Sequence, residues 1–414
     1  MHHRLDVTRT ALALTLLTVA ATANAQQPTA ATATPAAQQG MVAAAPVVSP
    51  DVAASGAVTF RLVAPNAQKV TVSVEGNAKP FDLQKNAAGT WEATTAPMQP
   101  QIYGYTFAVD GQRTLDPRNA HIRPNLISPT TVVEVPAPTS QPWDRTDIPH
   151  GTVEHVLYRS KLVTPDADDT GDRDMWVYTP PGYDPARKQP YPVLYLNHGY
   201  SDGAEGWVQA GQANLILDSL LHDGKIAPMV VVMPLGYGEM KIVTAGWNRV
   251  GGLIFENQQL FSKQLLQEVV PMAEARFHIA RDRDHRAIAG LSMGGGHSIY
   301  TGLNHTDTFA YVGAFSSAVV SPLLQNTGWQ TNANQADLDK GFRAIVPNAA
   351  TQPPVKLYWQ SCGTEDSLMA SNRAFGTWAK ANIKGNVQVR ETPGMHTWMV
   401  WRDDLIAFTP LLFR

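Results

Sequence analysis

The feature that most restricts the fold of this chain is a serine enclosed by glycines between a strand pattern and a helix pattern. Residues 286–289 (RAIA) form a short run typical of a buried strand, and residues 295–300 (GGHSIY) begin a helix pattern. Between them, residues 290–294 (GLSMG) match the pattern G-x-S-x-G. A strand that becomes a helix within about three residues leaves no room for side chains beside the serine and strains its backbone. We therefore expect a sharp turn that presents the hydroxyl of Ser292 at its tip.

The turn belongs to a region in which short apolar strands alternate with helices. Residues 193–197 and 229–233 are apolar runs of the buried parallel-strand type, and residues 212–221 and 258–277 have helical periodicity. Further strands are expected at residues 311–315, 356–359 and 387–390, and a further helix at 369–381. Such alternation over residues 151–414 predicts a three-layer α/β domain with a mostly parallel sheet.

The preceding region, residues 51–136, has the period of two that is typical of β-strands. Its strongest runs alternate or are rich in β-branched and aromatic residues. They are residues 58–63 (VTFRLV), 70–74 (VTVSV) and 103–109 (YGYTFAV). This region is therefore predicted to be a small all-β, immunoglobulin-like sandwich. The proline-rich segment 137–150 is expected to be a hinge between the two domains.

The N-terminal residues have the pattern of an export signal followed by a linker. Residues 1–25 carry two arginines near the start, an apolar run at 11–21 (ALALTLLTVAA) and a small-x-small cleavage site at 23–25 (ANA). Residues 26–50 contain no charged residue and are rich in Ala, Gln, Thr and Pro, which predicts a disordered linker. We therefore expect a periplasmic or secreted protein with no membrane attachment once the signal is removed.

The composition excludes several classes of protein and of site. A net charge of −3 gives no basic surface, so a nucleic-acid partner is not expected. Cys362 is the single cysteine, which rules out an intrachain disulfide framework and a cysteine-rich metal site. We expect neither a cofactor nor a metal.

A serine hydroxyl is a weak nucleophile that needs a base, and the base needs a carboxylate that orients it. In α/β-hydrolases these groups occur in the chain order Ser, acid, His. Of the three histidines that follow Ser292, His297 and His305 belong to the helix that leaves the turn. His396 alone leaves room for an acid before it, and it stands in a loop just after an expected strand. His396 is therefore the predicted base.

The acid is expected in the loop that follows the strand beginning at residue 356, where Glu365 and Asp366 are neighbours. The side chains of adjacent residues leaving a strand face roughly opposite ways, so we expect one of the two to reach His396. We favour Asp366 as the acid, and Glu365 is the alternative.

The oxyanion that forms during acyl transfer needs backbone N–H donors already aimed at it. Met293 follows the serine and begins the helix, so its N–H is one expected donor. The second is expected from residues 196–200 (LNHGY), where the N–H of Tyr200 is the candidate. A metal-ligand role for His198 is the rival interpretation of this loop, but no nearby cysteine or carboxylate cluster supports it.

Four ordered motifs between residues 150 and 414 resemble those of one family. They are NHGYSDGAEGW, AIAGLSMGGGHSIY, CGTEDSL and PGMHTWMVWR. They look like the "Putative esterase" branch of the α/β-hydrolases, which includes carbohydrate esterase family one and contains feruloyl, acetylxylan and enterochelin esterases and mycolyltransferases. The resemblance implies a catalytic triad of Ser292, Asp366 and His396, with Tyr200 and Met293 as oxyanion donors.

The predicted β-sandwich carries a resemblance of its own. FRLVAPNAQKVTVSVEG, GTWEAT, YGYTFAVDG and LDPRN resemble the early-set domain that precedes the catalytic domain in glycogen-branching enzymes and many bacterial esterases. That family often has a tryptophan after its second strand that can stack on glucan, whereas residues 77–81 (NAKPF) contain none. Trp91 remains and is expected in the core. We therefore expect a scaffold beside the active site rather than a glycan-binding module.

The expected substrate is a carbohydrate or aromatic ester. Trp207, Trp247 and Asn248 are expected in loops at the carboxyl edge of the sheet, where substrates bind, and an aromatic acyl group such as ferulate would suit them. The long polar segment 321–354 is expected to cover the site. The leading hypothesis is a serine esterase acting on feruloyl, or else acetyl, esters of plant cell-wall polysaccharide. The alternatives are an enterochelin-type siderophore esterase and a non-catalytic carbohydrate-binding protein on a hydrolase scaffold.

Overall fold

The computed structural model describes most of the chain after the N-terminal segment. The described residues are 47–246, 253–323, 334–347, 349 and 351–414. Val47–Arg414 forms one compact unit. The predicted signal peptide, most of the predicted linker, Trp247 and Asn248 lie outside the described residues. None of the helices described here is long and apolar enough to cross a membrane.

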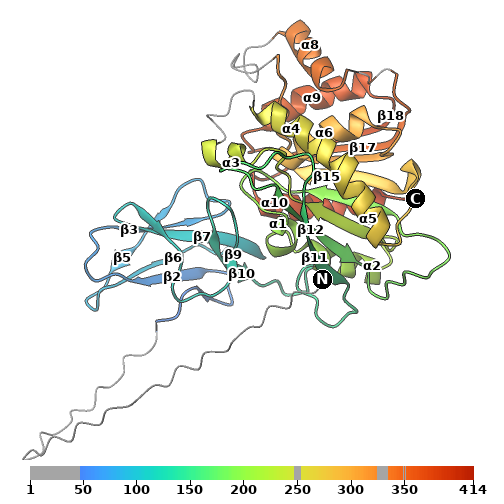
Figure 1. Ribbon diagram of the computed structural model, residues 1–414. Helices are drawn as coiled ribbons and strands as arrows, with labels where there is room; N and C mark the ends of the chain where they lie inside the picture. The colour runs from blue at the N-terminus through green and yellow to red at the C-terminus, as the bar shows by residue number, and fades with distance from the viewer. Residues whose placement is uncertain (1–46, 247–252, 324–333, 348, 350) are drawn as a thin grey trace, which may run out of the picture. The chain divides into compact units, whose positions relative to one another are not determined.

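The first described region is all-β and contains two antiparallel sheets (Figure 1). One sheet has the order β1 (Asp51–Val52), β2 (Val58–Val63), β6 (Thr90–Thr94) and β5 (Gln84–Lys85). The other has the order β4 (Phe81–Asp82), β3 (Val70–Val74), β7 (Gln101–Val109), β10 (Thr130–Val135) and β9 (Ile122–Arg123), with β8 (Gln112–Thr114) paired to β7. Alternate residues of β2, such as Val58 and Phe60, enter a shared core that also contains Trp91. The predicted sandwich is confirmed, and Trp91 lies in its core as expected.

The second region is built on an eight-stranded sheet. Its order is β11 (Thr152–Arg159), β12 (Asp172–Thr179), β14 (Val230–Pro234), β13 (Val193–Asn197), β15 (Arg286–Leu291), β16 (Tyr311–Phe315), β17 (Val355–Gly363) and β18 (Gly385–Thr392). The strands from β14 to β18 pair in parallel, whereas β11 and β12 are antiparallel to their neighbours. The predicted α/β-hydrolase domain with a mostly parallel sheet is confirmed. The apolar-run criterion misses β11, because it is an edge strand whose side chains are mostly exposed or half-buried.

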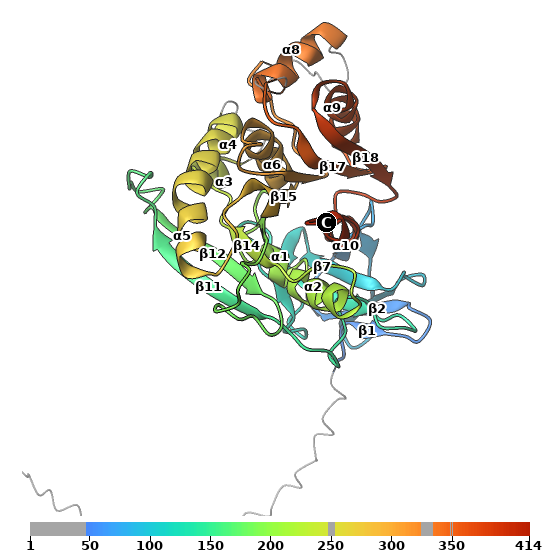
Figure 2. The same cartoon turned by 90° about the vertical axis from the view of Figure 1, so that its right-hand side faces the viewer.

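Helices lie on both faces of this sheet (Figures 1 and 2). They are α1 (Gly206–Gln209), α2 (Ala213–His222), α3 (Lys241–Ala245), α4 (Leu253–Gln264), α5 (Val270–Arg276), α6 (Met293–Asn304), α8 (Gln335–Ile345), α9 (Met369–Asn382) and α10 (Trp398–Phe408). A π-helical turn, Leu265–Val269, joins α4 to α5, and short 3₁₀ turns occur at Arg283–His285 and Thr409–Leu411. The proline that interrupts the predicted helix at 258–277 is the second residue of α5, directly after the π-helical turn.

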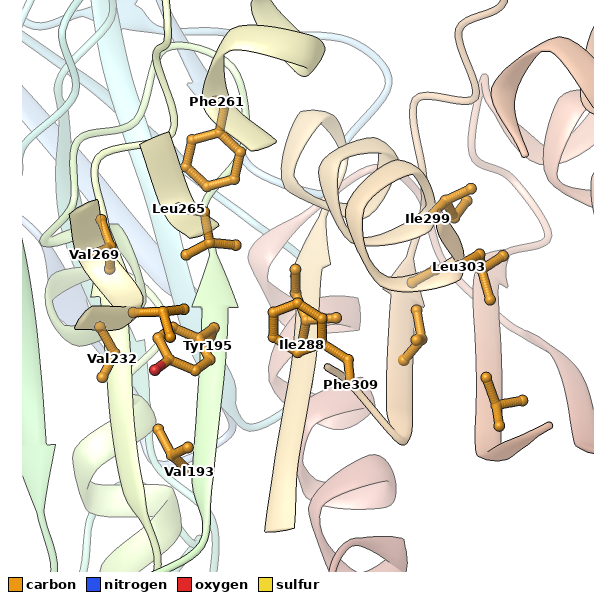
Figure 3. Packing of buried hydrophobic residues seen from close by; sticks show 14 of the residues in the cluster. Val193, Tyr195, Val232, Phe261, Leu265, Val269, Ile288, Ile299, Leu303 and Phe309 are labelled. Carbon is orange, nitrogen blue, oxygen red and sulfur yellow. The ribbon is translucent and has the colours of Figure 1, made fainter. Parts of the chain in front are cut away.

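Successive residues of the central strands point into two separate cores. Val193 and Tyr195 of β13 belong to the core that includes residues of α4 and α6 (Figure 3). Leu194 and Leu196 belong to the other core, which includes residues of α2 and α10. This burial on both faces explains why β13 reads as a continuous apolar run, and it holds the carboxyl end of the strand in a fixed position.

Two segments with predicted roles are partly packed. Trp143, within the predicted hinge at 137–150, is buried in the core that includes residues of α2 and α10. Phe342 of α8, within the segment 321–354, is buried in the opposite core. Residues 324–333, 348 and 350 of that segment lie outside the described residues, so the cover over the site stays a prediction. The domain boundaries also stay a prediction.

Candidate active site

Ser292 stands between β15 and α6 in a strained backbone conformation. Its φ of +52° and ψ of −115° are rare for a residue with a side chain. Its neighbours hold it there, because the Ser292 N–H donates to the oxygen of Phe315 and its carbonyl accepts from the N–H of Ala318, both at 2.8 Å. Strain that the surroundings enforce in this way is typical of functional sites. The predicted strand-to-helix turn is present.

The two glycines of the motif are required by close backbone contacts. A β-carbon on Gly290 would lie 2.6 Å from the backbone of Gly294. One on Gly294 would lie 2.4 Å from the carbonyl oxygen of His198, at the end of the adjacent strand β13. Any side chain at either position would push α6 away from the sheet and move Ser292.

Ser292, His396 and Asp366 form one hydrogen-bonded row, although they lie far apart in the chain. His396 Nε2 is 3.0 Å from Ser292 Oγ, and His396 Nδ1 is 2.7 Å from Asp366 Oδ2. The Asp366 side chain is fully buried, whereas that of His396 is 31% exposed. The structure thus brings together the three residues predicted as nucleophile, base and acid.

The surroundings of Asp366 favour its ionised form. Burial by itself would raise the pKa of Asp366, but the hydrogen bond and the charge of His396, with a 2.7 Å hydrogen bond from the N–H of Leu368, lower the pKa below its usual value. An ionised Asp366 accepts Nδ1–H of His396, which leaves Nε2 to accept the proton of Ser292. Glu365, the alternative acid, is exposed, and within the described part of the chain its side chain forms no hydrogen bond or ion pair with the imidazole.

The loop that carries His396 is bonded to the turn that carries Asp366. The N–H of Glu365 donates to the oxygen of Gly394 at 3.0 Å. A β-carbon on Gly363, at the end of β17, would lie 2.2 Å from that same oxygen. On its other side, the ring of His396 meets the ring of Trp401 edge-on, with centroids 4.9 Å apart. These contacts hold the imidazole of His396 and the carboxylate of Asp366 in fixed relative positions.

The loop after β13, residues 198–202 (HGYSD), passes directly beside Ser292, and we call it the oxyanion loop. A β-carbon on Gly199 would lie 3.4 Å from Cβ of Ser292. The next peptide N–H belongs to Tyr200, the predicted donor. The other predicted donor, Met293, is the first residue of α6, where helix N–H groups have no carbonyl within the helix to bind. Both predicted donors therefore lie on segments that adjoin the nucleophile.

His198 holds the oxyanion loop through both ring nitrogens. Its Nδ1 is 2.7 Å from the carbonyl oxygen of Gly199, and its Nε2 accepts a 2.7 Å hydrogen bond from the N–H of Gly236. Burial lowers the pKa of His198 to about 4, so the ring is neutral and carries its proton on Nδ1. With both nitrogens bonded within the protein, the imidazole is a structural bridge. From the sequence, a metal ligand was the one role weighed for His198, so the bridging role was missed; the adjacent Gly199, whose carbonyl the ring bonds, is the signal that could have indicated it.

One predicted substrate-binding residue is in the core. The side chain of Trp207 is 0% exposed, its Nε1 donates to the oxygen of Asn197 at 3.0 Å, and its ring packs edge-on against Phe315 and Trp398. The prediction that Trp207 contacts substrate is therefore wrong, because the indole covers the end of the sheet. Trp247 and Asn248 lie outside the described residues, so their role stays a prediction.

A cavity of about 570 Å³ borders the segment that carries His396, and none of Ser292, His396 and Asp366 lines it. Its lining combines residues of the sandwich with residues next to His396 and Asp366. They include Phe81, Met98 and Tyr103 of the sandwich, Met395 and Thr397 on either side of His396, and Glu365. The lining is mainly apolar, and it also contains three carboxylates, those of Glu75, Glu365 and Asp403.

Comparison with known proteins gives a family match and one long sequence relative. Residues 170–412 match the family model described as "Putative esterase". The chain is 29% identical over 374 residues to the endo-1,4-beta-xylanase/feruloyl esterase of Xylanibacter ruminicola. That alignment covers 88% of this chain and 46% of the relative, so the chain spans about half of the relative's length.

Solved structures with the same fold include two esterases. A CE1 ferulic acid esterase from Anaeromyces mucronatus superposes with a TM-score of 0.54 at 24% identity, over 65% of this chain and 93% of that one. The enterobactin esterase of Shigella flexneri superposes with a TM-score of 0.62 at 19% identity, over 86% of this chain and 92% of that one. Because both sequence identities are below 25%, these superpositions establish that this chain shares the fold of the two esterases.

Proposed function

The chain belongs to the esterase family described as "Putative esterase", and from this premise we propose that it hydrolyses carboxylic esters through an acyl-enzyme on Ser292. The observation that carries the proposal is the row from Ser292 Oγ to His396 Nε2 at 3.0 Å and from His396 Nδ1 to Asp366 Oδ2 at 2.7 Å. A nucleophile bonded to a base that is itself oriented by a buried carboxylate is the arrangement that serine hydrolysis needs.

The reaction follows from this row. Ser292 Oγ attacks the ester carbonyl carbon while its proton passes to Nε2 of His396, and the carbonyl oxygen becomes an oxyanion. When the tetrahedral intermediate collapses, the bond to the alcohol breaks and His396 gives its proton to the departing oxygen. Water then attacks the acyl group while His396 takes one of its protons. When this second intermediate collapses, the bond from the acyl carbon to Ser292 Oγ breaks, His396 returns the proton to Oγ, and the carboxylic acid leaves. Asp366 stays ionised throughout and stabilises the imidazolium.

The N–H groups of Met293 and Tyr200 are proposed to stabilise the oxyanion. A trans peptide is planar, so the carbonyl of Gly199 and the N–H of Tyr200 point in opposite directions. The bond from His198 to the Gly199 carbonyl therefore fixes the direction of the Tyr200 N–H. A donor fixed before the substrate arrives stabilises the developing charge without reorganisation during the reaction.

We propose feruloyl esters of plant cell-wall polysaccharide as the substrate class, with acetyl esters second. The support is the relative named as a xylanase/feruloyl esterase, whose alignment covers 88% of this chain. The sequence pattern at residues 1–25 further supports export to the periplasm or the medium.

A siderophore esterase is the second candidate, because the enterobactin esterase of Shigella flexneri shares the fold. Ferric catecholates are anionic and would be favoured by positive charge near the site. We place this candidate second because the relative named as a xylanase/feruloyl esterase aligns over 88% of this chain at 29% identity, whereas the enterobactin esterase structure shares the fold at 19% identity.

A panel of three substrates tests these assignments. Wild-type protein should release ferulate from methyl ferulate faster than acetate from acetylated xylan, and it should leave enterobactin intact. Ser292→Ala should lose about 10⁴- to 10⁶-fold in kcat on any substrate that is cleaved, because no other hydroxyl can form the acyl-enzyme. Activity on enterobactin alone would assign the siderophore function. Wild-type turnover in Ser292→Ala would contradict the triad, and binding to xylan without cleavage of any ester would favour the non-catalytic alternative.

A further inference from the structure

Glu75, which directly follows β3 of the sandwich, contacts the segment that carries His396. One carboxylate oxygen of Glu75 accepts a 2.9 Å hydrogen bond from the N–H of Trp398. Trp398 is the first residue of α10 and follows His396 by two positions. A carboxylate at the first turn of a helix satisfies an N–H with no partner in the helix and is favoured there by the helix dipole. The contact therefore fixes the end of the loop that holds the base.

Glu75 is itself held in one position. Its other oxygen accepts hydrogen bonds from Arg123 Nη1 at 2.7 Å and from the N–H of Gly104 at 2.9 Å. The side chains of Glu75 and Arg123 are only 11% and 15% exposed. Burial would raise the pKa of Glu75, but the charges of Arg123 and Arg402 lower it below its usual value. The carboxylate is therefore ionised and has little freedom to move.

The same part of the sandwich also contacts the oxyanion loop. Asn125 is two residues after Arg123, and its Nδ2 lies 3.0 Å from both Ser201 Oγ and Asp202 Oδ1. The N–H of Leu126 donates to the oxygen of Ser201 at 2.8 Å. Ser201 is next to Tyr200 and has a φ of +69°, so these bonds hold a turn that the chain would otherwise relax.

Arg402 also fixes the sandwich to the hydrolase domain through hydrogen bonds. Arg402 of α10 is fully buried, and its guanidinium donates to Gln101 Oε1 at 3.0 Å and to the oxygens of Ile102 and Ala210 at 2.7 Å. Gln101 and Ile102 belong to β7 of the sandwich, whereas Ala210 follows α1. One side chain thus ties the sandwich to two helical segments of the hydrolase domain.

From these contacts we propose that the sandwich is part of the catalytic apparatus, with Glu75 as a positioning residue for His396 and Asn125 as a positioning residue for the oxyanion loop. Arg123 joins the two, because it pairs with Glu75 and stands two residues before Asn125. The inference rests on the proposed function of Ser292 and His396. It goes beyond a scaffold role, because it assigns to named side chains an effect on the chemical step.

The test compares kcat and KM on p-nitrophenyl acetate with the rate at which paraoxon phosphorylates Ser292. Glu75→Ala should lower kcat about 10- to 100-fold with KM little changed, because a small displacement of the base is costly while a small ester makes few binding contacts. The paraoxon rate should fall by a similar factor, since that reaction uses the same nucleophile and base. Adding Arg123→Ala to Glu75→Ala should change kcat little, because Arg123 acts through Glu75. Asn125→Ala should lower both rates in the same way.

Two further variants separate positioning from general loss of stability. Asp116 is a buried carboxylate that accepts hydrogen bonds from the hydroxyls of Ser49 and Tyr105 and from the backbone N–H of Arg118 within the sandwich. Asp116→Asn should therefore lower Tm while leaving kcat within about twofold of wild type. Glu75→Gln keeps the side-chain length and an accepting oxygen, so its kcat should lie between those of wild type and Glu75→Ala, and it replaces Glu75→Ala if that variant does not fold.

Two results would overturn the proposal. The first is a wild-type kcat in both Glu75 variants while Ser292→Ala is inactive. The second is that Asp116→Asn loses as much kcat as Glu75→Ala at the same loss of Tm. An active Ser292→Ala would instead refute the proposed function itself, so the two failures are distinguishable.

Discussion

The imidazole of His198 accepts a 2.7 Å hydrogen bond from the backbone N–H of Gly236, which joins the loop after β13 to the loop after β14. Its other nitrogen bonds to the Gly199 carbonyl, in the peptide whose N–H belongs to Tyr200. The ring is buried, and that burial lowers its pKa to about 4, so this bridge keeps the same hydrogen bonds across the neutral pH range. The donor proposed for the oxyanion thus depends on a side chain that touches no substrate.

His198→Ala should therefore lower kcat by about 10²- to 10³-fold, the cost typical of losing one oxyanion donor. Steady-state kinetics on p-nitrophenyl acetate would measure it. The matched control is His297→Leu, because His297 is also a buried neutral histidine and stacks on Phe261 with centroids 4.4 Å apart. That variant should keep kcat within about tenfold of wild type. Equal losses in the two variants would show that the effect comes from packing alone.

The two neighbouring carboxylates should differ sharply on substitution. Asp366→Asn should lower kcat by about three to four orders of magnitude, because an amide cannot hold the His396 tautomer that leaves Nε2 free to accept the serine proton. Glu365→Gln should lower kcat about tenfold or less, since Glu365 is exposed and does not bond to the imidazole of His396 in the described structure. The kcat of both variants on one ester measures this difference, and circular dichroism checks that both variants are folded. The reverse ranking would make Glu365 the acid.

The parts of the site that could be predicted are those that local sequence fixes. A G-x-S-x-G motif between a strand and a helix forces a sharp turn at the serine, and Ser292 accordingly has a strained, positive φ. Asp366 and His396 follow from chain order, because both stand in loops at the carboxyl end of parallel strands that lie side by side. Such loops meet at one edge of the sheet whatever the details of packing.

The parts that could not be predicted depend on packing between distant segments. Trp207 is expected in a loop from the sequence but belongs to the short helix α1, and the direction of its side chain is set by a carbonyl at the end of β13 and by the rings that surround it. The contact from Glu75 to Trp398 joins residues 323 positions apart, and no pattern in either segment indicates it. Contacts of this kind depend on how whole elements dock, which single-sequence periodicity does not encode.

The corrected role of Trp207 gives a prediction of its own. Trp207→Phe should lower Tm and leave KM for methyl ferulate unchanged, because the substitution removes a buried hydrogen bond and part of a packed ring without touching the substrate. Losses of this kind are typically about 1–3 kcal/mol in the free energy of unfolding. Thermal unfolding and steady-state kinetics on the same preparation measure both quantities. A raised KM at unchanged Tm would restore Trp207 to the substrate site.

The last prediction concerns Asp404, a buried carboxyl of α10 near the triad. Burial raises its pKa from 3.8 to about 7; the neighbouring Ser361 side chain and the charge of Arg390 oppose the increase, whereas the charges of Asp403 and Asp366 add to it. Between these two pKa values the folded state binds a proton that the unfolded state has lost, so the contribution of Asp404 to stability falls as pH rises from about 4 to about 7 and stays low above that range.

Asp404→Asn should remove this dependence, because an amide is neutral at every pH. Relative to wild type, the variant should gain stability progressively from pH 4 to pH 7, by an amount on the order of 4 kcal/mol at most, and the gain should stay constant at higher pH. Urea unfolding at pH 5, 6, 7 and 8 measures the difference. Asp403→Asn on the adjacent position is the control, and we expect a smaller gain because Asp403 is less buried. A stability difference for Asp404→Asn that does not change with pH would mean that this carboxyl ionises at its ordinary pKa in the folded protein.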